Sequence, residues 1–196
     1  PIYEPGLEEI LKRNYKQKRL IFTSDLKKAV NNSDIIFICV GTPTKKNSNS
    51  ADLKYVFKVV HELKKIIIKY KIIVTKSTVP VTTGDKIEKI LLKLKKKKLV
   101  DVVSNPEFLR EGEAISDFTK PDRVIIGTES KKANTKMKSL YMPIIKKNSR
   151  YFNTSRRGAE LIKYASNAFL ATKISYINEL ANLCEKAGVD IKDISQ

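Results

Sequence analysis

Long hydrophobic runs are missing from this chain of 196 residues. No apolar stretch approaches the roughly 18 residues that a transmembrane helix requires, so we expect no membrane-spanning segment. No basic-then-apolar leader opens the sequence, so no signal peptide is visible, and we expect a cytoplasmic protein. Because the chain starts at Pro1 rather than at Met and stops at Gln196 just after a helix signal, we interpret it as an internal fragment.

Cysteine and histidine are also scarce, with two Cys and one His. Cys39 lies in an apolar run and Cys184 in a helical pattern, and neither has a CxxC partner or a nearby His. This spacing indicates neither a metal site nor a disulfide framework. The single histidine, His61, sits in a lysine-rich helical segment, a setting that is typical of a surface side chain.

Arginine is rare for so basic a chain, with only seven Arg among 39 basic residues and a net charge of +18. A nucleic-acid-binding module is expected to gather Arg and aromatic side chains on one face. Here the lysines fall on predicted helix faces and in turns, such as the run at 95–98, and the aromatics fall in apolar or loop positions. We therefore interpret the charge as solvated surface lysines and expect no nucleic-acid partner.

Strand and helix patterns alternate along most of the chain. This rhythm predicts an α/β fold with a mostly parallel sheet and helices on both faces. The unbroken apolar run at 34–40 is typical of a strand covered on both sides, and Thr82 with Asp85 looks like a capping box. Strands are predicted at 34–40, 71–75, 100–104, 123–128 and 151–152, and helices at 25–31, 52–70, 82–97 and 131–141.

The last part of the sequence predicts one long helix from about 155 to 187. It contains no proline and only Gly158 near its start, and Gly188 is a natural C-terminal stop. Apolar residues cover much of its surface, so we expect it to pack against a second domain and a partner subunit. A further helix is expected to begin at Asp190.

Polar clusters follow three successive strands, at 41–44, 76–80 and 105–111. Any one of them could be an ordinary loop. Ligands of open α/β sheets bind at the carboxyl ends of the strands. Three clusters on consecutive strands therefore predict one common crevice.

These clusters belong to longer motifs, which are VGTPT (40–44), KSTVP (76–80), NPEFLREGEAISDF (105–118), PDRVIIG (121–127) and AELIKYASNAFLATKISYINELANLCE (159–185). Together with the opening PIYEPGLEEIL, they resemble the nucleotide-sugar 6-dehydrogenases of the UDP-glucose/GDP-mannose dehydrogenase family. The resemblance covers essentially the whole chain. It implies an incomplete Rossmann-like NAD-binding domain over 1–153, without its first strand, Gly-rich turn and second strand. A connecting helix and the start of a central domain would follow over 154–196, with a homodimer or larger assembly formed through the long helix.

The family oxidises the primary alcohol of the sugar twice, to the acid, with two NAD⁺. A cysteine holds the aldehyde as a thiohemiacetal and then as a thioester. PDRVIIG after NPEFLRE resembles the UDP-glucose branch more, which implies production of UDP-glucuronate; GDP-mannose and a UDP-N-acetylhexosamine are the alternative substrates. The catalytic cysteine of the family lies in a GGSCF-type segment that is absent here, and neither Cys39 nor Cys184 matches it. We therefore expect the chain alone to be inactive.

By resemblance, four residues carry the catalysis. Lys163 and Asn167 lie four apart on one helix face and match the residues that stabilise an oxyanion. Glu107 matches the base that activates water for thioester hydrolysis, and Thr78 matches the hydroxyl that holds this water. A non-catalytic scaffold would have no reason to retain all four.

The resemblance also implies binding residues. Glu111 matches a carboxylate near both the nicotinamide and the substrate. The residues expected to bind NAD are Val40, Gly41, Thr42, Pro43, Thr44, Ser77, Thr78, Val79 and Glu111. The residues expected to bind the nucleotide sugar are Glu107, Phe108, Leu109, Arg110, Glu111, Lys163 and Asn167.

Overall fold

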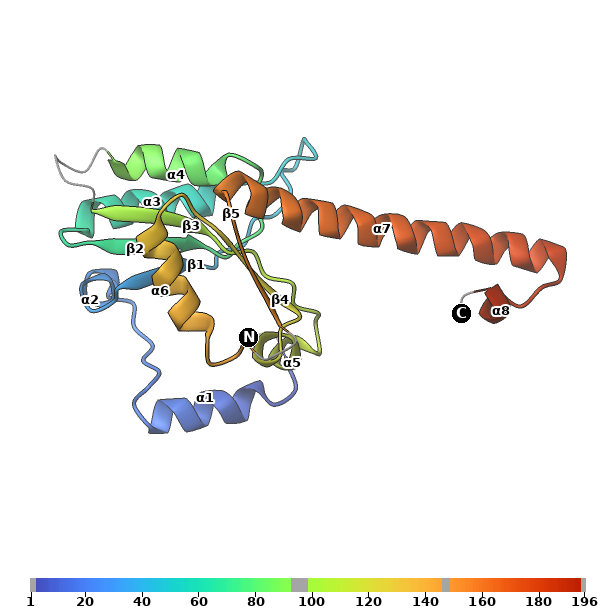
Figure 1. Cartoon of the computed structure of the whole chain (residues 1–196), viewed down its shortest axis with the longest axis horizontal. Helices are drawn as coiled ribbons and strands as arrows, with labels where there is room; N and C mark the ends of the chain where they lie inside the picture. The colour runs from blue at the N-terminus through green and yellow to red at the C-terminus, as the bar shows by residue number, and fades with distance from the viewer. Residues whose placement is uncertain (1–2, 93–98, 146–148, 195–196) are drawn as a thin grey trace.

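The computed structural model describes residues 3–92, 99–145 and 149–194 (Figure 1). A five-stranded sheet has the strand order β1-β2-β3-β4-β5. The strands are β1 (Ile35–Ile38), β2 (Lys71–Thr75), β3 (Val100–Ser104), β4 (Arg123–Gly127) and β5 (Arg150–Thr154). The helices are α1 (Leu7–Lys16), α2 (Leu26–Asn31), α3 (Lys54–Ile66), α4 (Thr83–Leu92), α5 (Ala114–Thr119), α6 (Lys131–Tyr141), α7 (Arg156–Ala187) and α8 (Ile191–Ile194).

The sheet is mostly parallel, as the sequence predicts. Strands β1, β2 and β3 pair in parallel, and so do β4 and β5. The change of direction lies between β3 and β4, which pair in antiparallel fashion at Ser104 and Gly127. The carboxyl ends of β1, β2 and β3 therefore share one edge of the sheet, where the three polar loops begin.

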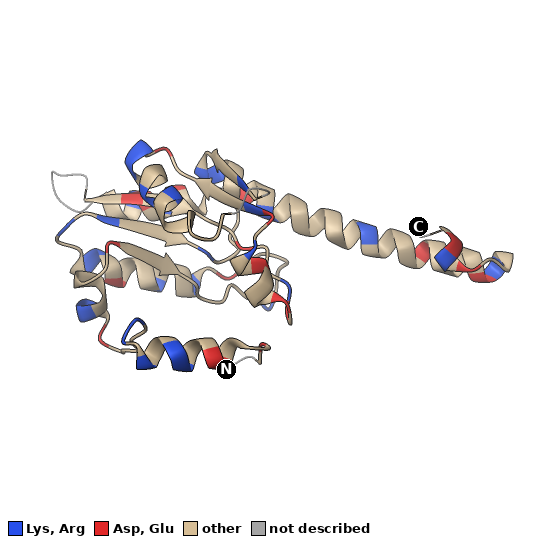
Figure 2. Ribbon diagram, turned by 60° about the horizontal axis from the view of Figure 1, so that its bottom comes forward, with Lys and Arg blue, Asp and Glu red and all other residues tan. Residues whose placement is uncertain are grey.

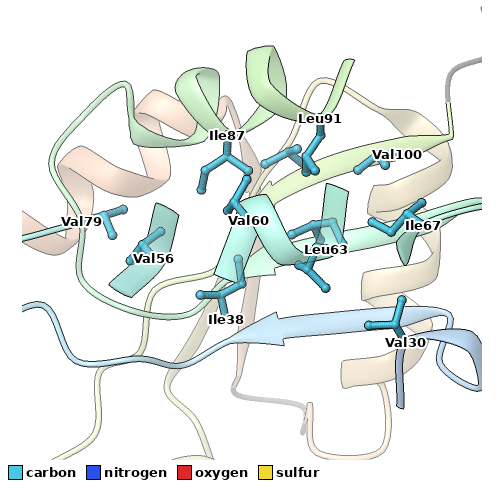
Figure 3. Close-up of a cluster of buried hydrophobic side chains, with 12 residues drawn as sticks. Val30, Ile38, Val56, Val60, Leu63, Ile67, Val79, Ile87, Leu91 and Val100 are labelled. Carbon is cyan, nitrogen blue, oxygen red and sulfur yellow. The ribbon is translucent and has the colours of Figure 1, made fainter. Parts of the chain in front are cut away.

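Helices cover both faces of the sheet. Val56, Val60 and Leu63 repeat at helical spacing along α3 and are buried with side chains of α2 and α4 on one face (Figure 3). On the other face, Met137 and Tyr141 of α6 pack against the inward residues of β2, β3 and β4. The predicted α/β fold with two helical layers is confirmed.

Strand β1 has helical cover on both sides, because Ile36 and Ile38 pack with the core on the α3 side and Ile35 packs with the core on the α6 side, although Phe37 is 37% exposed. One detail of the predicted sheet is wrong. The last strand is longer than the predicted 151–152, since β5 pairs with β4 along all five of its residues. Helices α1 and α5 were not expected from the sequence, and residues 93–97 of the helix predicted at 82–97 lie outside the described residues.

The capping box predicted at the start of α4 is also wrong. The backbone N–H of Thr82 donates to Glu160 of α7 rather than to Asp85. The Asp85 carboxylate is instead paired with Arg156 and Arg157, also on α7. A distant helix, not the local sequence, therefore supplies the polar groups at this helix end.

The predicted long helix is confirmed as α7, which is 32 residues long. The Ser155 hydroxyl accepts the N–H of Gly158 at its start, and Gly188 ends it in the left-handed conformation. The first turns pack closely on β4, because a Cβ added at Gly127 would lie 2.6 Å from the Cβ of Ala159. The rest of the helix extends away from the sheet (Figure 1). None of the helices in residues 3–92, 99–145 and 149–194 combines the length and the hydropathy that a membrane span requires.

Candidate functional site

The loops that follow β1 and β2 are joined by a dense set of hydrogen bonds. The Ser77 hydroxyl donates to the carbonyl oxygen of Val40 at 2.6 Å, and the Thr42 hydroxyl donates to that of Thr78 at 2.8 Å. The backbone N–H groups of Lys76 and Ser77 donate to the Ile38 carbonyl. These hydrogen bonds hold together four of the predicted NAD-binding residues, which are Val40, Thr42, Ser77 and Thr78. We call the surface formed by these four residues the cofactor wall.

The other predicted NAD-binding residues of these loops lie in different settings. Gly41 is exposed, and a Cβ built there would meet nothing within 4 Å, so the wall is open at this point. The carbonyl of Pro43 accepts the N–H of Asp52, and Thr44 bridges to Ala51, which closes the loop behind it. The Val79 side chain is buried in the hydrophobic core, so only its backbone can face a ligand.

Glu107 and Lys163 meet although 56 positions separate them. The Nζ of Lys163 lies 3.2 Å from Oε1 of Glu107, and the Lys163 side chain is only 9% exposed. The other carboxylate oxygen of Glu107 accepts the backbone N–H of Leu109 at 2.7 Å. The Phe108 ring lies 4.5 Å from the guanidinium of Arg123 and 5.2 Å from Nζ of Lys163. The loop after β3 is therefore docked against the first turns of α7 by charge and ring contacts.

Three other predicted site residues remain at the surface. Asn167 is exposed one helical turn beyond Lys163 and makes no hydrogen bond to the Glu107–Lys163 pair in the part of the chain that the structure describes. Arg110 is exposed and paired with Asp117 at 2.7 Å. Glu111 is exposed beside Gly112, whose N–H donates to Glu4. These side chains are accessible to a ligand, but in the described residues they form no hydrogen bond or ion pair with the Glu107 carboxylate.

A cavity of about 900 Å³ opens next to this pair. Basic, acidic and aromatic side chains line it, and they come from the loop after β3, from α5 and from the elements β4, β5 and α6. The predicted residues that line it are Glu107, Phe108, Leu109 and Arg110. Lys76, Arg123 and Phe152 are further lining residues that we did not predict as site residues.

A buried polar cluster forms the floor of this cavity. The Tyr141 hydroxyl and the Nζ of Lys76 both donate to the side-chain oxygen of Asn105, the latter at 3.3 Å. The Asn105 side-chain amide donates in turn to the carbonyl of Ile125 at 2.9 Å. Lys76 and Asn105 are the first residues of the KSTVP and NPEFLREG motifs, which was the only sequence signal for them. Their partner Tyr141 lies on α6, so the cluster could not be assembled from local sequence.

Burial sets the protonation behaviour of this floor. It lowers the pKa of Lys76 to about 8, an effect that the nearby carboxylate of Glu107 partly opposes. Burial also raises the pKa of Tyr141 to about 12, so this hydroxyl stays a hydrogen-bond donor at neutral pH. The cavity therefore places one carboxylate among the ammonium groups of Lys76 and Lys163, an arrangement suited to moving protons and stabilising negative charge.

Comparison with known proteins identifies the two parts of the chain. Residues 1–145 match the family model described as the UDP-glucose/GDP-mannose dehydrogenase family, NAD binding domain. Residues 157–196 match the central domain of the same family. The UDP-glucose 6-dehydrogenase of Rhizobium meliloti is 48% identical over 198 residues, an alignment that covers 100% of this chain and 45% of the relative. The chain thus spans about half the length of the curated relatives that it matches.

Solved structures agree with this assignment. A UDP-glucose dehydrogenase from the archaeon Pyrobaculum islandicum superposes with a TM-score of 0.91 at 40% identity, over 98% of this chain and 45% of that chain. A GDP-mannose dehydrogenase from Pseudomonas aeruginosa, solved as a ternary complex, also gives a TM-score of 0.91, at 36% identity over 100% of this chain and 45% of that chain.

NAD is the cofactor of this domain, and the residues present fit one wall of its site. The wall of Val40, Thr42, Ser77 and Thr78 lies at the carboxyl ends of parallel strands, where dinucleotides bind in such sheets. It is uncharged and held by its own hydrogen bonds, and Gly41 leaves space in front of it. From the matched family models and these superpositions, we conclude that the chain belongs to the UDP-glucose/GDP-mannose dehydrogenase family.

Proposed function

We propose that this chain is the NAD-binding part of an enzyme that oxidises UDP-glucose to UDP-glucuronate in two steps. The observation that carries the proposal is the Glu107–Lys163 contact, which unites the loop after β3 with α7 at the edge of the sheet. The 48% identity to a UDP-glucose 6-dehydrogenase supports the choice of substrate. The chain covers 45% of that relative, so we expect the complete enzyme, and not this chain alone, to be active.

Lys163 and Glu107 have different roles in this proposal. The ammonium group of Lys163 stabilises the negative oxygen that forms when the thiol or water adds to the carbonyl, and Asn167 adds an amide donor on the same face. Glu107 removes a proton from the water that attacks the thioester, and the thiol of the family's catalytic cysteine is released. Thr78 holds this water. NAD, when bound, accepts the hydride in each oxidation.

The remaining parts of the proposal concern ligands and assembly. The loops 40–44 and 77–79 together with Glu111 hold NAD, and residues 107–111 line the nucleotide sugar with Lys163 and Asn167. The NAD-binding domain extends over 1–153, and 154–196 form the connecting helix and the start of the central domain, a division supported by the two family models. The exposed apolar residues of α7 support a homodimer formed through this helix.

A second candidate is a GDP-mannose dehydrogenase, because a structure of that kind superposes equally well, with a TM-score of 0.91. An assay of the complete enzyme distinguishes the two. We expect NADH to form with UDP-glucose, in a ratio of two NADH per sugar, and to form far more slowly with GDP-mannose or UDP-N-acetylmannosamine. NADH production with only the second or third sugar would contradict the UDP-glucose assignment while leaving the family membership intact.

A further inference from the structure

Glu160 is a buried carboxylate near the start of α7, with 3% of its surface exposed. Its Oε2 accepts the backbone N–H of Thr82 at 2.7 Å, and its Oε1 accepts that of Gly84 at 2.7 Å. The Ser104 hydroxyl donates to Oε1 at 3.3 Å. A buried charge is costly unless it is fully hydrogen-bonded, and the N-terminus of α4 supplies both the N–H groups and the favourable dipole.

The backbone around Glu160 is shaped to receive this carboxylate. Thr82 has a φ of 79°, a left-handed conformation that is uncommon for a residue other than glycine. Such strain persists only where the surrounding structure holds it in place, and here its N–H points at Glu160. A Cβ built at Gly84 would lie 3.1 Å from Oε1 of Glu160, so a side chain there would press on the carboxylate.

One carboxylate thereby joins the three segments that carry the proposed catalytic residues. Thr82 lies four residues after Thr78, in the loop that leaves β2. Ser104 is the last residue of β3 and lies three residues before Glu107. Glu160 lies three residues before Lys163, on the same face of α7. Each of Thr78, Glu107 and Lys163 therefore lies only three or four residues from Glu160 itself or from a residue that is hydrogen-bonded to it. None of the three can move far without disturbing Glu160 or its hydrogen bonds.

We propose that Glu160 is a positioning residue that sets the distance between Glu107 and Lys163 and fixes the loop that carries Thr78. This inference rests on the proposed function, because only an active site gives that geometry a purpose. Glu160 touches neither Glu107 nor Lys163 through its own hydrogen bonds. Its effect is transmitted along three short stretches of backbone.

A neighbouring ion-pair network makes this role separable from simple folding. Arg156 pairs with Asp85 at 3.1 Å and with Glu88 at 2.7 Å, which holds α7 to α4 one turn before Glu160. Glu160→Gln keeps the size of the side chain and leaves these ion pairs intact. We therefore expect the variant to remain folded with α7 docked. Glu9→Gln, at an exposed carboxylate on α1 away from the proposed site and from the free end of α7, is the control.

The first measurement is hydrogen–deuterium exchange of the complete protein without substrate. Glu160→Gln should raise exchange at least about threefold in both 76–84 and 104–111, relative to wild type and to Glu9→Gln. An increase confined to the first turn of α4 would overturn the proposal, because Glu160 would then be a helix cap only. This measurement does not depend on enzymatic activity, so its result can be distinguished from a failure of the proposed function.

The second measurement is steady-state kinetics. Glu160→Gln should lower kcat with UDP-glucose about tenfold or more, because the reacting groups lose their alignment. KM for NAD should rise by a smaller factor than kcat falls, and the melting transition should stay above the assay temperature. A folded variant with unchanged kcat overturns the proposal. A wild-type enzyme inactive with every nucleotide sugar would instead overturn the proposed function.

A milder substitution covers the case in which Glu160→Gln does not fold. Ser104→Ala removes only the 3.3 Å bond to Glu160. It should raise exchange in 104–111 but not in 76–84, and it should lower kcat by a smaller factor. If neither exchange nor kcat changes, the coupling through Glu160 is refuted.

Discussion

The two ends of α7 both depart from the usual pattern, in which apolar side chains are buried and charged side chains are exposed. At the anchored end, residues 156–163, the buried side chains include Arg156, Glu160 and Lys163. At the free end, residues 164–187, Phe169 is 67% exposed and Leu170 is 58% exposed. Figure 2 shows a long stretch of this end without charge, and 164–172 contain no charged residue. The anchored end thus buries three ions, whereas the free end exposes large apolar groups.

This difference assigns different tasks to the two ends. Buried ions have a high energetic cost and are retained where they orient groups or perform chemistry. The buried ions of the anchored end therefore support the proposal that the active site lies there. A large exposed apolar surface indicates a missing neighbour, and the free end is where the central domain and a partner subunit are expected to pack.

The largest expected effect is at the anchored end. Lys163→Ala in the complete enzyme should lower turnover by roughly 10²–10³-fold, because the oxyanion loses its cation. NAD binding should persist, since the cofactor wall is formed by loops that Lys163 does not contact. Turnover assays and NAD titration calorimetry test this together, and near-normal turnover would remove the oxyanion role.

The close packing that anchors α7 can be broken at Gly127. In Gly127→Ala, the new Cβ would lie 2.6 Å from the Cβ of Ala159 and 2.7 Å from the Ser155 carbonyl. Such overpacking should lower the free energy of unfolding by about 1–3 kcal/mol in urea titrations. Gly41→Ala is the control, because nothing lies within 4 Å of its Cβ. Equal stability of the two variants would show that α7 is not tightly docked.

The buried lysine on the cavity floor predicts a pH dependence. Burial lowers the pKa of Lys76 to about 8 from 10.5, so between these values the unfolded chain binds a proton that the folded chain does not. This contribution to stability therefore increases as the pH rises from 8 to 10.5. NMR titration of labelled lysine side chains should show one resonance that titrates near pH 8 and disappears in Lys76→Met. A pKa of Lys76 equal to that of surface lysines would contradict the described floor.

The smallest effect on the isolated chain is expected at the free end. Because Leu170 is 58% exposed, Leu170→Lys should change the free energy of unfolding by less than about 0.5 kcal/mol. In the complete protein, however, it should weaken the assembly, which sedimentation velocity would detect. Unchanged assembly, with an equally stable monomer, would place the subunit contact elsewhere.

The elements with strong periodicity were predictable from sequence, and the long-range polar contacts were not. Strands β2 and β3 coincide with their apolar runs, and α6 and α7 with their helical spacing. The partial exposure of Phe37 in β1 could not be inferred, because it depends on which elements cover that part of the sheet. The capping box failed because a single turn of sequence cannot reveal that Glu160, some 78 residues later, supplies the acceptor for Thr82.

For the site, family motifs indicated Glu107 and Lys163, and the structure places them in contact. The motifs gave no role to Lys76, Asn105 or Glu160, although all three lie inside them. Their partners are Tyr141 on α6 and the backbone of α4. Such roles follow from the packing of distant segments and become visible only in three dimensions.

The most direct test of the assignment is mass spectrometry of the complete Glu107→Gln enzyme after mixing with UDP-glucose and NAD. Glutamine cannot take the proton from the attacking water, so hydrolysis should stall and a covalent sugar adduct should accumulate on the protein. We predict that adduct together with a burst of NADH and slow release of acid. Full turnover without any adduct would contradict the proposed role of the Glu107–Lys163 site.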